Sequence, residues 1–404
     1  MSRRKFKPAS RTAKITYAIR EVTQYARKFK QETGAEILHL NIGDPAKYDF
    51  EIPEHIREAF CRAINEGYNF YAPSAGLDEL RDAIIKREKR DNNISIAPDD
   101  ILVTNGTAEA IMAILAAAFS PGDEILVPSP CYPPYISAAA FYDTIAIEYR
   151  TIEEEEWIPD IDDLRRKISD KTKAIILINP NNPTGAVYDS KIVKEIIDIA
   201  GEYELFVISD EIYDKILFEG NKAPNAASLA NDVPVIVFYG LSKVYLAPGW
   251  RIGYMYRWDP ENKLSDLWDG IFKFLMVRIS GFTPAQKAAV AALLGPQDHI
   301  TKLVDKLRER RDFVFKRLNE IEGLSTALPK GAFYIFPKIE IEKYKNRDRD
   351  FVIDLLHHEH VLVVHGSGFG IYGNDHIRIV YLPPIDVLEE SMNRIERFVK
   401  KVSK

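Results

Sequence analysis

The sequence contains few cysteines and no long apolar run, and each absence excludes a class of protein. Its 404 residues include two cysteines, Cys61 and Cys131, which lie far apart and form no Cys-x-x-Cys pair. This argues against a disulfide scaffold or a thiolate zinc site and fits a reducing compartment, so a cytoplasmic protein is expected. The longest apolar run, Ala110 to Phe119, is half of the roughly 20 residues that a membrane span needs, so no membrane span is predicted.

The sequence also lacks an excess of positive charge. Its net charge of −6 gives no general attraction to nucleic acid or to anionic membranes, and no nucleic-acid partner is expected. The N-terminus is a local exception, because no acidic residue precedes Glu21. Such a start is typical of an organelle transit peptide, but no apolar segment or cleavage site follows, so a solvent-exposed arm is favoured. The basic residues of this arm are Arg3, Arg4, Lys5, Lys7, Arg11 and Lys14.

Short apolar runs alternate with helical stretches between residues 101 and 256. Strands are expected at Ile101–Thr104, Glu124–Val127, Thr144–Tyr149, Ala174–Ile178, Phe206–Ser209, Val235–Tyr239 and Arg251–Tyr256. Helices are expected at Ala108–Phe119, Asp160–Ile168 and Ile192–Ala200. Short strands that are hydrophobic on both faces and separated by helices indicate an α/β fold with a mostly parallel sheet covered on both sides.

The alternation ends after Pro296. A long charged helix is expected at Lys302–Asn319, and a β-rich tail follows it. The change in pattern indicates a second domain, and the length is ample for two. The predicted large domain spans residues 51–299, and residues 1–50 and 300–404 are predicted to form an N-terminal arm and a small domain.

A lysine and an aspartate each follow a predicted buried strand. Lys243 ends the segment Gly240-Leu241-Ser242-Lys243. A desolvated lysine has a lowered pKa and becomes nucleophilic, although a lysine at a strand end is more often a snorkelling surface residue. Asp210 follows Phe206–Ser209, at the strand edge where ligands bind in open α/β sheets. An aspartate in this position is also an ordinary helix N-cap.

Three further segments could present an anion-binding group or an amide. Arg251 opens a predicted strand, and its planar fork suits a phosphate or a structural ion pair. Gly106 and Thr107 join a strand to a helix, where backbone N–H groups bind anions, although threonine is also a common N-cap. Asn182 lies in the turn Asn179–Gly185, in which two Asn-Pro steps fix an irregular backbone.

In their order and spacing these five segments resemble the fold-type-I pyridoxal 5′-phosphate (PLP) enzymes, specifically the class I and II aminotransferases. The resemblance extends from Asn41–Pro45 to His376–Val380. The alanine aminotransferase branch is suggested by Asn41–Pro45, by Tyr71–Leu77, by Gly240–Lys243 and by His365–Gly370. The family fold implied is a large PLP-binding domain with a mostly parallel central sheet and a small α+β domain.

The resemblance implies a role for each residue around the cofactor. Lys243 would bind PLP covalently and carry a proton between the substrate and the cofactor, and Asp210 would pair with the pyridinium nitrogen. Asn182 and Tyr213 would hydrogen-bond the ring 3′-oxygen, and Tyr132 would stack on the ring. The residues implied at the phosphate are Gly106, Thr107, Ala108, Arg251 and, from the neighbouring subunit of a homodimer, Tyr71.

The resemblance also implies how the substrate binds. Arg378 would hold the substrate α-carboxylate bidentately, with help from the backbone of Gly43 and from Asn182. Tyr17 and Arg20 are candidate residues at the mouth of the site, and the surface of an amphipathic helix is an equally good interpretation of both.

One position departs from the family pattern, and three other signals are weak. Many relatives have a serine three residues before the lysine; here Gly240 leaves the phosphate contact to Ser242, to the backbone or to nothing. The run His357–His360 lacks a matching set of metal ligands, and no metal is expected. Gly366–Gly370 does not fit a dinucleotide loop and is interpreted as a turn near the substrate. The acidic run Glu153–Glu156 is expected to be a solvated loop.

The reaction implied by the branch moves an amino group from L-alanine to 2-oxoglutarate in a ping-pong sequence. A broad or aromatic donor range stays open, because Tyr17, Tyr71, Tyr132 and Tyr334 could line the pocket. A C–S β-lyase on the same fold is the other enzymatic alternative. A transcription regulator is disfavoured, since the roughly 40 residues before Asn41 are too few for a winged-helix domain.

Overall fold

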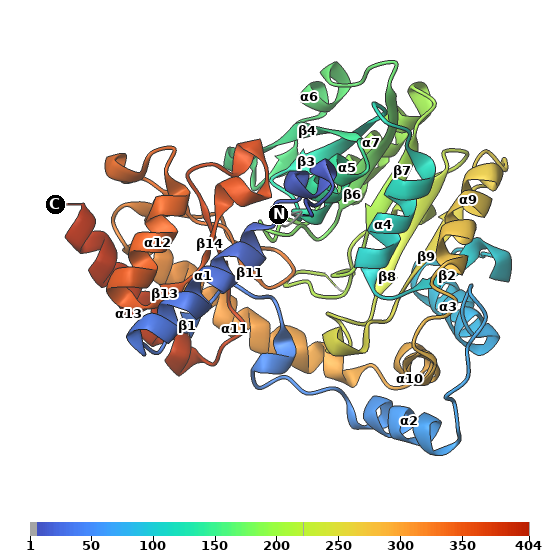
Figure 1. The fold of residues 1–404 in the computed structure, drawn as a ribbon, viewed down its shortest axis with the longest axis horizontal. Coiled ribbons are helices and arrows are strands. Elements are labelled where there is room, and N and C mark those ends of the chain that lie inside the picture. The colour runs from blue at the N-terminus through green and yellow to red at the C-terminus, as the bar shows by residue number, and fades with distance from the viewer. Residues whose placement is uncertain (1–5, 221, 404) are drawn as a thin grey trace, which may run out of the picture.

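An eight-stranded sheet forms the centre of the protein, which is described here from a computed structural model covering residues 6–220 and 222–403 (Figure 1). The strand order is β2-β9-β8-β7-β6-β3-β4-β5. Neighbouring strands from β8 through β7, β6 and β3 to β4 run parallel, whereas β9 is antiparallel to both of its neighbours and β5 is antiparallel to β4. The predicted α/β class and mostly parallel sheet are therefore confirmed. The strands are β2 (Ile101–Thr104), β3 (Glu124–Ser129), β4 (Ile145–Ile152), β5 (Ile158–Pro159), β6 (Thr172–Ile178), β7 (Phe206–Asp210), β8 (Val235–Gly240) and β9 (Gly253–Trp258).

The sheet is covered on both faces because its strands are apolar at successive positions. In β6, Ile175 and Leu177 belong to one buried cluster, whereas Ile176 and Ile178 point to the other face and belong to a second cluster. The helices that pack with the second cluster are α4 (Thr107–Ala118), α5 (Pro134–Phe141) and α9 (Ser265–Met276). The first cluster includes residues of α3 (Asp78–Asn92), α7 (Ser190–Glu202), α8 (Ala226–Leu229) and α10 (Thr283–Leu294). The short helices α2 (Glu54–Asn65) and α6 (Ile161–Arg166) lie nearer the surface.

Residues from both ends of the chain form a second group of elements, in which the blue and red ribbons lie side by side (Figure 1). Leu38 pairs with Val361, which joins β1 (Leu38–His39) to β13 (Val361–Leu362) in parallel. A three-stranded antiparallel sheet contains β11 (Tyr334–Ile335), β15 (Ile377–Val380) and β14 (Val364–His365), and β10 (Leu324–Ser325) pairs with β12 (Lys338–Ile339). The surrounding helices are α1 (Ala18–Thr33), α11 (Asp298–Glu320), α12 (Asp348–Glu359) and α13 (Ile385–Val402). The domain boundaries near residues 50 and 300 stay a prediction.

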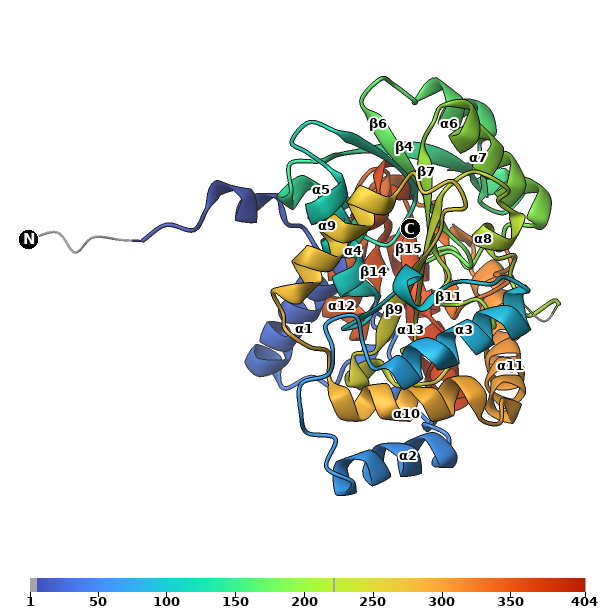
Figure 2. The ribbon, with the colours of Figure 1, turned by 90° about the vertical axis from the view of Figure 1, so that its right-hand side faces the viewer.

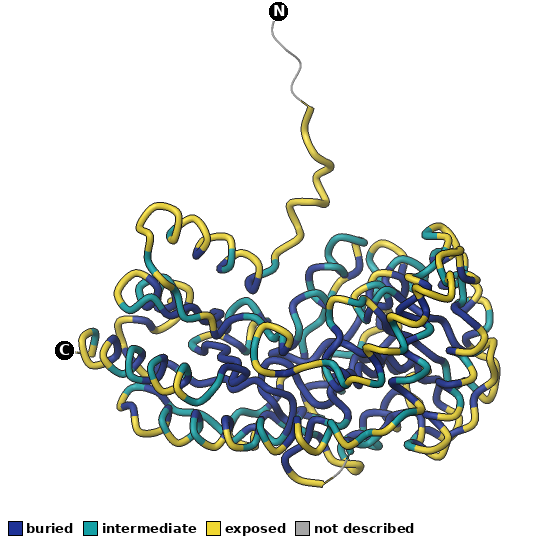
Figure 3. Tube along the Cα trace, turned by 90° about the horizontal axis from the view of Figure 1, so that it is seen from below, coloured by how far each residue is buried: buried dark blue, intermediate teal, exposed yellow. Residues whose placement is uncertain are grey.

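The N-terminal arm leaves the body of the molecule, and its described part, residues 6–16, is exposed throughout (Figures 2 and 3). The basic residues Arg3, Arg4 and Lys5 lie outside the described residues. No helix in the described ranges is long and apolar enough to cross a membrane. Within the same ranges, no group of three or more His, Cys, Asp or Glu side chains is arranged to hold a metal ion.

Two expectations about local structure are wrong, the second of them in part. Strand β9 begins at Gly253, and Arg251 instead follows a 3-10 turn in the left-handed region at φ 55°. Its guanidinium holds this turn, because Nη1 donates to the Pro248 carbonyl at 2.9 Å. In the acidic run, Glu154–Glu156 are exposed as expected, but Glu153 is not simply solvated: Glu153–Glu155 is a 3-10 turn, and Glu153 pairs with Lys338 at 2.9 Å and with His376 at 3.1 Å.

A buried ion network contacts β8, the strand that precedes Lys243. Arg87 in α3 is fully buried and pairs with Glu88, Asp91 and Asp214. Burial disfavours the charge, yet Glu88 and Asp214 hold the pKa of Arg87 above its ordinary value. The Arg87 guanidinium also lies 4.1 Å from the ring centroid of Tyr239 in β8. The network therefore connects α3 to β8 and to the loop that follows β7.

Replacing Arg87 with methionine should strongly destabilise the protein. The substitution leaves the Glu88 and Asp214 carboxylates buried without their cation, which costs about 3–5 kcal/mol for a broken buried pair. The midpoint of thermal unfolding reports the loss. As a matched control, Lys194→Met removes the exposed pair with Asp198 in α7 and should cost at most about 1 kcal/mol. Equal midpoints in the two variants would contradict this account of the network.

Candidate active site

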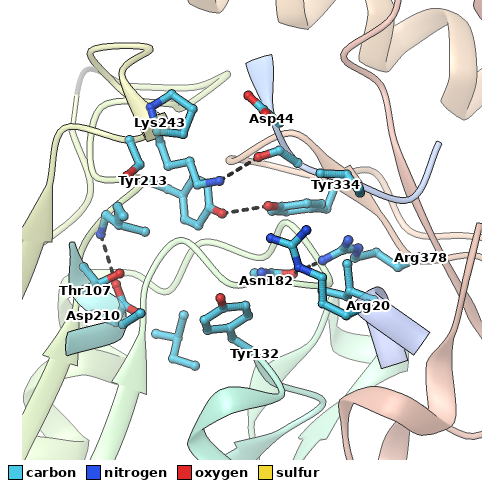
Figure 4. A pocket seen from close by; sticks show the side chains of 18 of the residues that line it. Arg20, Asp44, Thr107, Tyr132, Asn182, Asp210, Tyr213, Lys243, Tyr334 and Arg378 are labelled. Carbon is cyan, nitrogen blue, oxygen red and sulfur yellow. Dashed lines mark hydrogen bonds between the residues drawn. The ribbon is translucent and has the colours of Figure 1, made fainter. Parts of the chain in front are cut away.

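A cavity of about 490 Å³ lies at the carboxyl edge of the sheet, against the strands of the second group (Figure 4). Asn182, Asp210 and Lys243 all reach it, because each lies at or just after the end of one of the parallel strands β6, β7 and β8. The volume suits a small-molecule site. Of the predicted site residues, those that line the cavity are Tyr17, Arg20, Gly43, Thr107, Ala108, Tyr132, Asn182, Asp210, Tyr213, Ser242, Lys243, Arg251 and Arg378.

Lys243 points into the cavity (Figure 4). Its Nζ donates a hydrogen bond to the Gly43 carbonyl at 2.7 Å, so the lysine bridges from β8 to the segment that follows β1. Burial lowers the pKa of Lys243 to about 8, and the nearby Arg378 cation acts in the same direction. The neutral, nucleophilic amine is therefore a minor form near neutral pH, but far more populated than in an ordinary lysine.

Asp210 is the last residue of β7 and is buried. Its Oδ2 accepts a hydrogen bond from the Tyr135 hydroxyl at 2.8 Å, and its Oδ1 accepts one from the Ile212 N–H at 3.3 Å. Burial raises the pKa of Asp210 to about 6, against the lowering effect of the Tyr135 hydrogen bond. The alternative of a helix N-cap does not apply, since the next helix, α8, begins at Ala226. A cation in the cavity would relieve the cost of this buried carboxylate.

Arg378 lies in β15 and is 1% exposed. Its Nη1 donates to the Asn182 Oδ1 at 3.0 Å, and its Nη2 donates to the Asn41 carbonyl at 2.5 Å. The buried Nε has no hydrogen-bond partner among the described residues. A buried guanidinium that lacks an anionic partner is suited to bind a carboxylate that enters the cavity.

The opposite end of the cavity offers an anion site. Helix α4 begins at Thr107, and its first two residues, Thr107 and Ala108, line the cavity. The N–H groups of this first turn have no acceptor within the helix and can bind an anion. The Arg251 Nη2 donates to the Asn105 carbonyl at 3.2 Å in the same place. Gly106 is required here, because its φ is +77° and a Cβ atom would lie 2.5 Å from the Arg251 Nη2. Gly106 thus packs against Arg251 at the anion site but does not itself line the cavity.

Gly240, the departure from the family pattern, lies in a crowded place. A Cβ atom at this position would lie 3.2 Å from the Ile252 carbonyl oxygen and 3.5 Å from the Gly253 Cα, so the antiparallel partner β9 restricts a side chain there. Ser242 is buried and lines the cavity two residues later. Of the two positions, Ser242 is the one with a hydroxyl at the cavity wall.

Aromatic side chains and α1 form the mouth of the cavity. Tyr17 precedes α1, and its hydroxyl shares a 3.1 Å hydrogen bond with the Tyr132 hydroxyl. The Arg20 guanidinium lies near Asn182 and Arg378 (Figure 4). Tyr71 is not in this group: it is 80% exposed and does not line the cavity of its own chain.

Residues 35–395 match the model of the family described as aminotransferase class I and II. The chain belongs to this aminotransferase family. It is similar to the glutamate-pyruvate aminotransferase of Haemophilus influenzae, with 36% identity over 98% of each chain. It is also 36% identical to the aromatic-amino-acid aminotransferase 2 of Thermococcus litoralis, over 90% of this chain and 92% of that one. Among solved structures it resembles the alanine aminotransferase of Pyrococcus furiosus, with 56% identity, a TM-score of 0.95 and coverage of 98% and 100%.

The sequence did not single out every residue that this aminotransferase places at its site. Tyr135 was given no role, yet its hydroxyl donates a hydrogen bond to Asp210. Tyr334 was expected only as a possible wall, and its hydroxyl bonds Tyr213 at 2.8 Å. Lys47 lines the cavity beside Gly43 and carried no sequence signal. Helix α5 brings Tyr135 onto β7, a contact that sequence spacing does not reveal.

Asp210→Asn should change how the stability of the cofactor-free aminotransferase depends on pH. An aspartate whose folded pKa is raised contributes stability that is present below its unfolded pKa and is lost as the pH rises through the folded value. The window is therefore about pH 4 to 6, and the pKa difference of about 2 corresponds to about 3 kcal/mol. As the pH rises across this range, the midpoint of thermal unfolding of the wild type should fall relative to that of the variant. A difference that stays constant from pH 4 to 7 would show that Asp210 titrates normally.

Proposed function

We propose that this aminotransferase uses PLP to transfer the amino group of L-alanine to 2-oxoglutarate. The observation that carries the proposal is one cavity in which Lys243, with its lowered pKa, lies between the buried Asp210 and the buried Arg378. The similarity to an alanine aminotransferase and a glutamate-pyruvate aminotransferase over nearly the full length supports the choice of substrates.

The residues present fit PLP. A phosphate suits the N-terminus of α4 together with Arg251, and a protonated pyridine nitrogen suits Asp210. The Tyr132 ring is available to cover the cofactor ring, and Tyr213 and Asn182 are available to bond its 3′-oxygen. When bound, PLP supplies an electron sink that stabilises negative charge at the substrate Cα.

The chain itself performs the proton transfer and the orientation. The Lys243 Nζ would hold PLP and, as a free amine, would take a proton from the substrate Cα and hold it for return. A pKa of about 8 suits this cycle, because both protonation states are accessible near neutral pH. Arg378 holds the α-carboxylate, and Asn182 fixes the plane of the guanidinium through its Oδ1.

Tyr17 and Arg20 are proposed as the substrate-binding residues at the mouth of the cavity. A dicarboxylate such as 2-oxoglutarate needs a second cation besides Arg378, and Arg20 lines the cavity without an ion-pair partner in the described part of the chain. An aromatic donor is the second candidate, since Tyr17, Tyr132 and Tyr334 offer apolar ring surface. The aromatic-amino-acid aminotransferase among the relatives supports that alternative.

A homodimer with shared active sites is proposed from the surface around Tyr71. The neighbouring segments carry large apolar side chains that face solvent, which on a folded protein indicate an interface. The two segments adjoin, because the Ser74 hydroxyl donates to the Ile279 carbonyl at 2.7 Å. We place Tyr71 at the PLP phosphate of the partner subunit. The exposed apolar residues of this surface are Phe70, Met276, Val277, Ile279 and Phe282. The free cysteines Cys61 and Cys131 support the cytoplasm as the proposed location.

Turnover with L-alanine and 2-oxoglutarate should be abolished by Lys243→Ala. Loss of the positioned acid–base group alone lowers kcat by about 10²–10⁴-fold. Pyruvate and glutamate formation measures the reaction, and L-tyrosine and L-phenylalanine are compared as donors at equal concentration. A larger kcat/KM for the aromatic donors would shift the proposal to the aromatic alternative. Pyruvate and ammonia formed from a thioether amino acid without any 2-oxo acid would identify a β-lyase instead.

Tyr71→Ala and Lys243→Ala should complement one another when the two inactive variants are unfolded and refolded together. A mixed dimer has one site in which both Lys243 and the partner's Tyr71 are intact, so activity should return toward a quarter of the wild-type value as the two chains pair at random. Each variant refolded alone is the control. Recovery no greater than the sum of the two controls would mean that Tyr71 does not act across a dimer interface.

A further inference from the structure

Tyr334 lies between the two halves of the site. It belongs to β11, where it pairs with Val380 two residues from Arg378 on the neighbouring strand β15. The Arg378 guanidinium carbon lies 4.6 Å from the centroid of the Tyr334 ring, and Tyr334 is 2% exposed. The ring thus makes a cation–π contact with the guanidinium that would bind the substrate carboxylate.

The hydroxyl of Tyr334 points away from Arg378 toward the lysine side of the cavity (Figure 4). It shares a 2.8 Å hydrogen bond with the Tyr213 hydroxyl. It also packs against Gly43: a Cβ atom there would lie 2.3 Å from the Tyr334 oxygen, so only glycine fits. The Gly43 carbonyl is the acceptor for the Lys243 Nζ. One side chain therefore contacts Arg378, Tyr213 and Gly43, the hydrogen-bond partner of Lys243.

The direction of the hydrogen bond between the two tyrosines decides whether Tyr213 can also donate into the cavity. Each hydroxyl has one proton to donate. If Tyr213 donates to Tyr334, it has no proton left for an acceptor in the cavity. Among the described residues the Tyr334 hydroxyl has no hydrogen-bond partner other than Tyr213, so Tyr334 is free to donate to Tyr213 and release the Tyr213 proton.

We propose that Tyr334 is a positioning residue whose hydroxyl donates to Tyr213, so that Tyr213 donates in turn to the 3′-oxygen of PLP. The proposal rests on the proposed function, because Tyr213 acts on that oxygen only if PLP occupies the cavity. A chain of hydrogen bonds strengthens each member through polarisation. The strength of the Tyr213 bond to the cofactor therefore depends on a residue of the strand pair that carries Arg378.

The electrostatic surroundings favour Tyr334 as the donor. Burial raises the pKa of both tyrosines, so both hydroxyls are protonated at neutral pH. The Arg378 cation lowers the pKa of both tyrosines, and it lies against the ring of Tyr334, a contact that favours Tyr334 as the donor. The other charged or titratable groups that face the pair are Asp210, Tyr17 and Lys243, the last with its Nζ 5.9 Å from the Tyr213 ring centroid.

The pH titration of the visible absorbance of the PLP-bound enzyme tests the proposal. Weaker donation to the 3′-oxygen leaves more negative charge there, which holds the proton next to the Lys243 nitrogen more tightly, so the midpoint should rise. Tyr334→Phe keeps the ring under Arg378 and removes only the hydroxyl. The midpoint of Tyr334→Phe should rise by roughly 10–30% of the rise measured in Tyr213→Phe, because one hydrogen bond in a chain strengthens its neighbour by about that proportion. The double variant should match Tyr213→Phe alone.

Tyr381→Phe is the matched control, because it removes another buried tyrosine hydroxyl, bonded to the Ala332 carbonyl at 3.3 Å, that is not in the cavity lining. Its midpoint should equal that of the wild type. An unchanged midpoint in Tyr334→Phe, an equal shift in the control, or additive shifts in the double variant would each overturn the role of Tyr334. A wild type that binds no PLP would overturn the proposed function first, and is told apart by the absence of any visible band.

Discussion

The shared burial of two cations, Lys243 and Arg378, is the constraint on which the rest of the site depends. Neither forms an ion pair with a carboxylate of the described chain. Desolvation lowers the pKa of each, and the Arg378 cation lowers the pKa of Lys243 further. The site tolerates this because Lys243 donates to the Gly43 carbonyl and Arg378 to Asn182 and the Asn41 carbonyl. Such an arrangement disfavours an empty cavity and favours anionic ligands, which is the property that a site for a phosphate cofactor and a carboxylate substrate requires.

Two separate parts of the fold are needed to bring these groups together. The parallel sheet delivers Asn182, Asp210 and Lys243 to one edge, since each follows a strand of the same direction. The second group of elements delivers Arg378 and Tyr334 from one strand pair, and Gly43 from the segment after β1. Because the cavity lies where the two meet, any shift between them changes the Tyr213–Tyr334 and Asn182–Arg378 hydrogen bonds directly. Catalytic geometry and the packing of the two groups are thus linked.

The sequence predicted the parallel strands and the residues at their ends, because strand hydrophobicity and chain order report directly on both. Its failures concern contacts between segments distant in the chain. Glu153 was interpreted as solvated because its run is acidic, whereas Lys338 and His376 reach it from the far end of the chain. Tyr135 gave no signal and Tyr334 only that of a possible pocket wall, since aromatic residues are common in cores and only packing directs their hydroxyls at Asp210 and Tyr213. Arg251 was predicted in a strand because apolar residues follow it. Its hydrogen bond to the Pro248 carbonyl instead holds it in the turn before the strand.

The central claim is that Lys243 carries PLP in a cavity able to accept alanine. The most direct measurement is the visible absorbance spectrum of the purified, PLP-supplied protein before and after L-alanine is added without any 2-oxo acid. The account predicts a visible band that disappears on addition, with one pyruvate released per subunit and no further turnover. A protein that shows no visible band even with excess PLP would contradict the assignment of Lys243, and a band unchanged by L-alanine would contradict alanine as the donor.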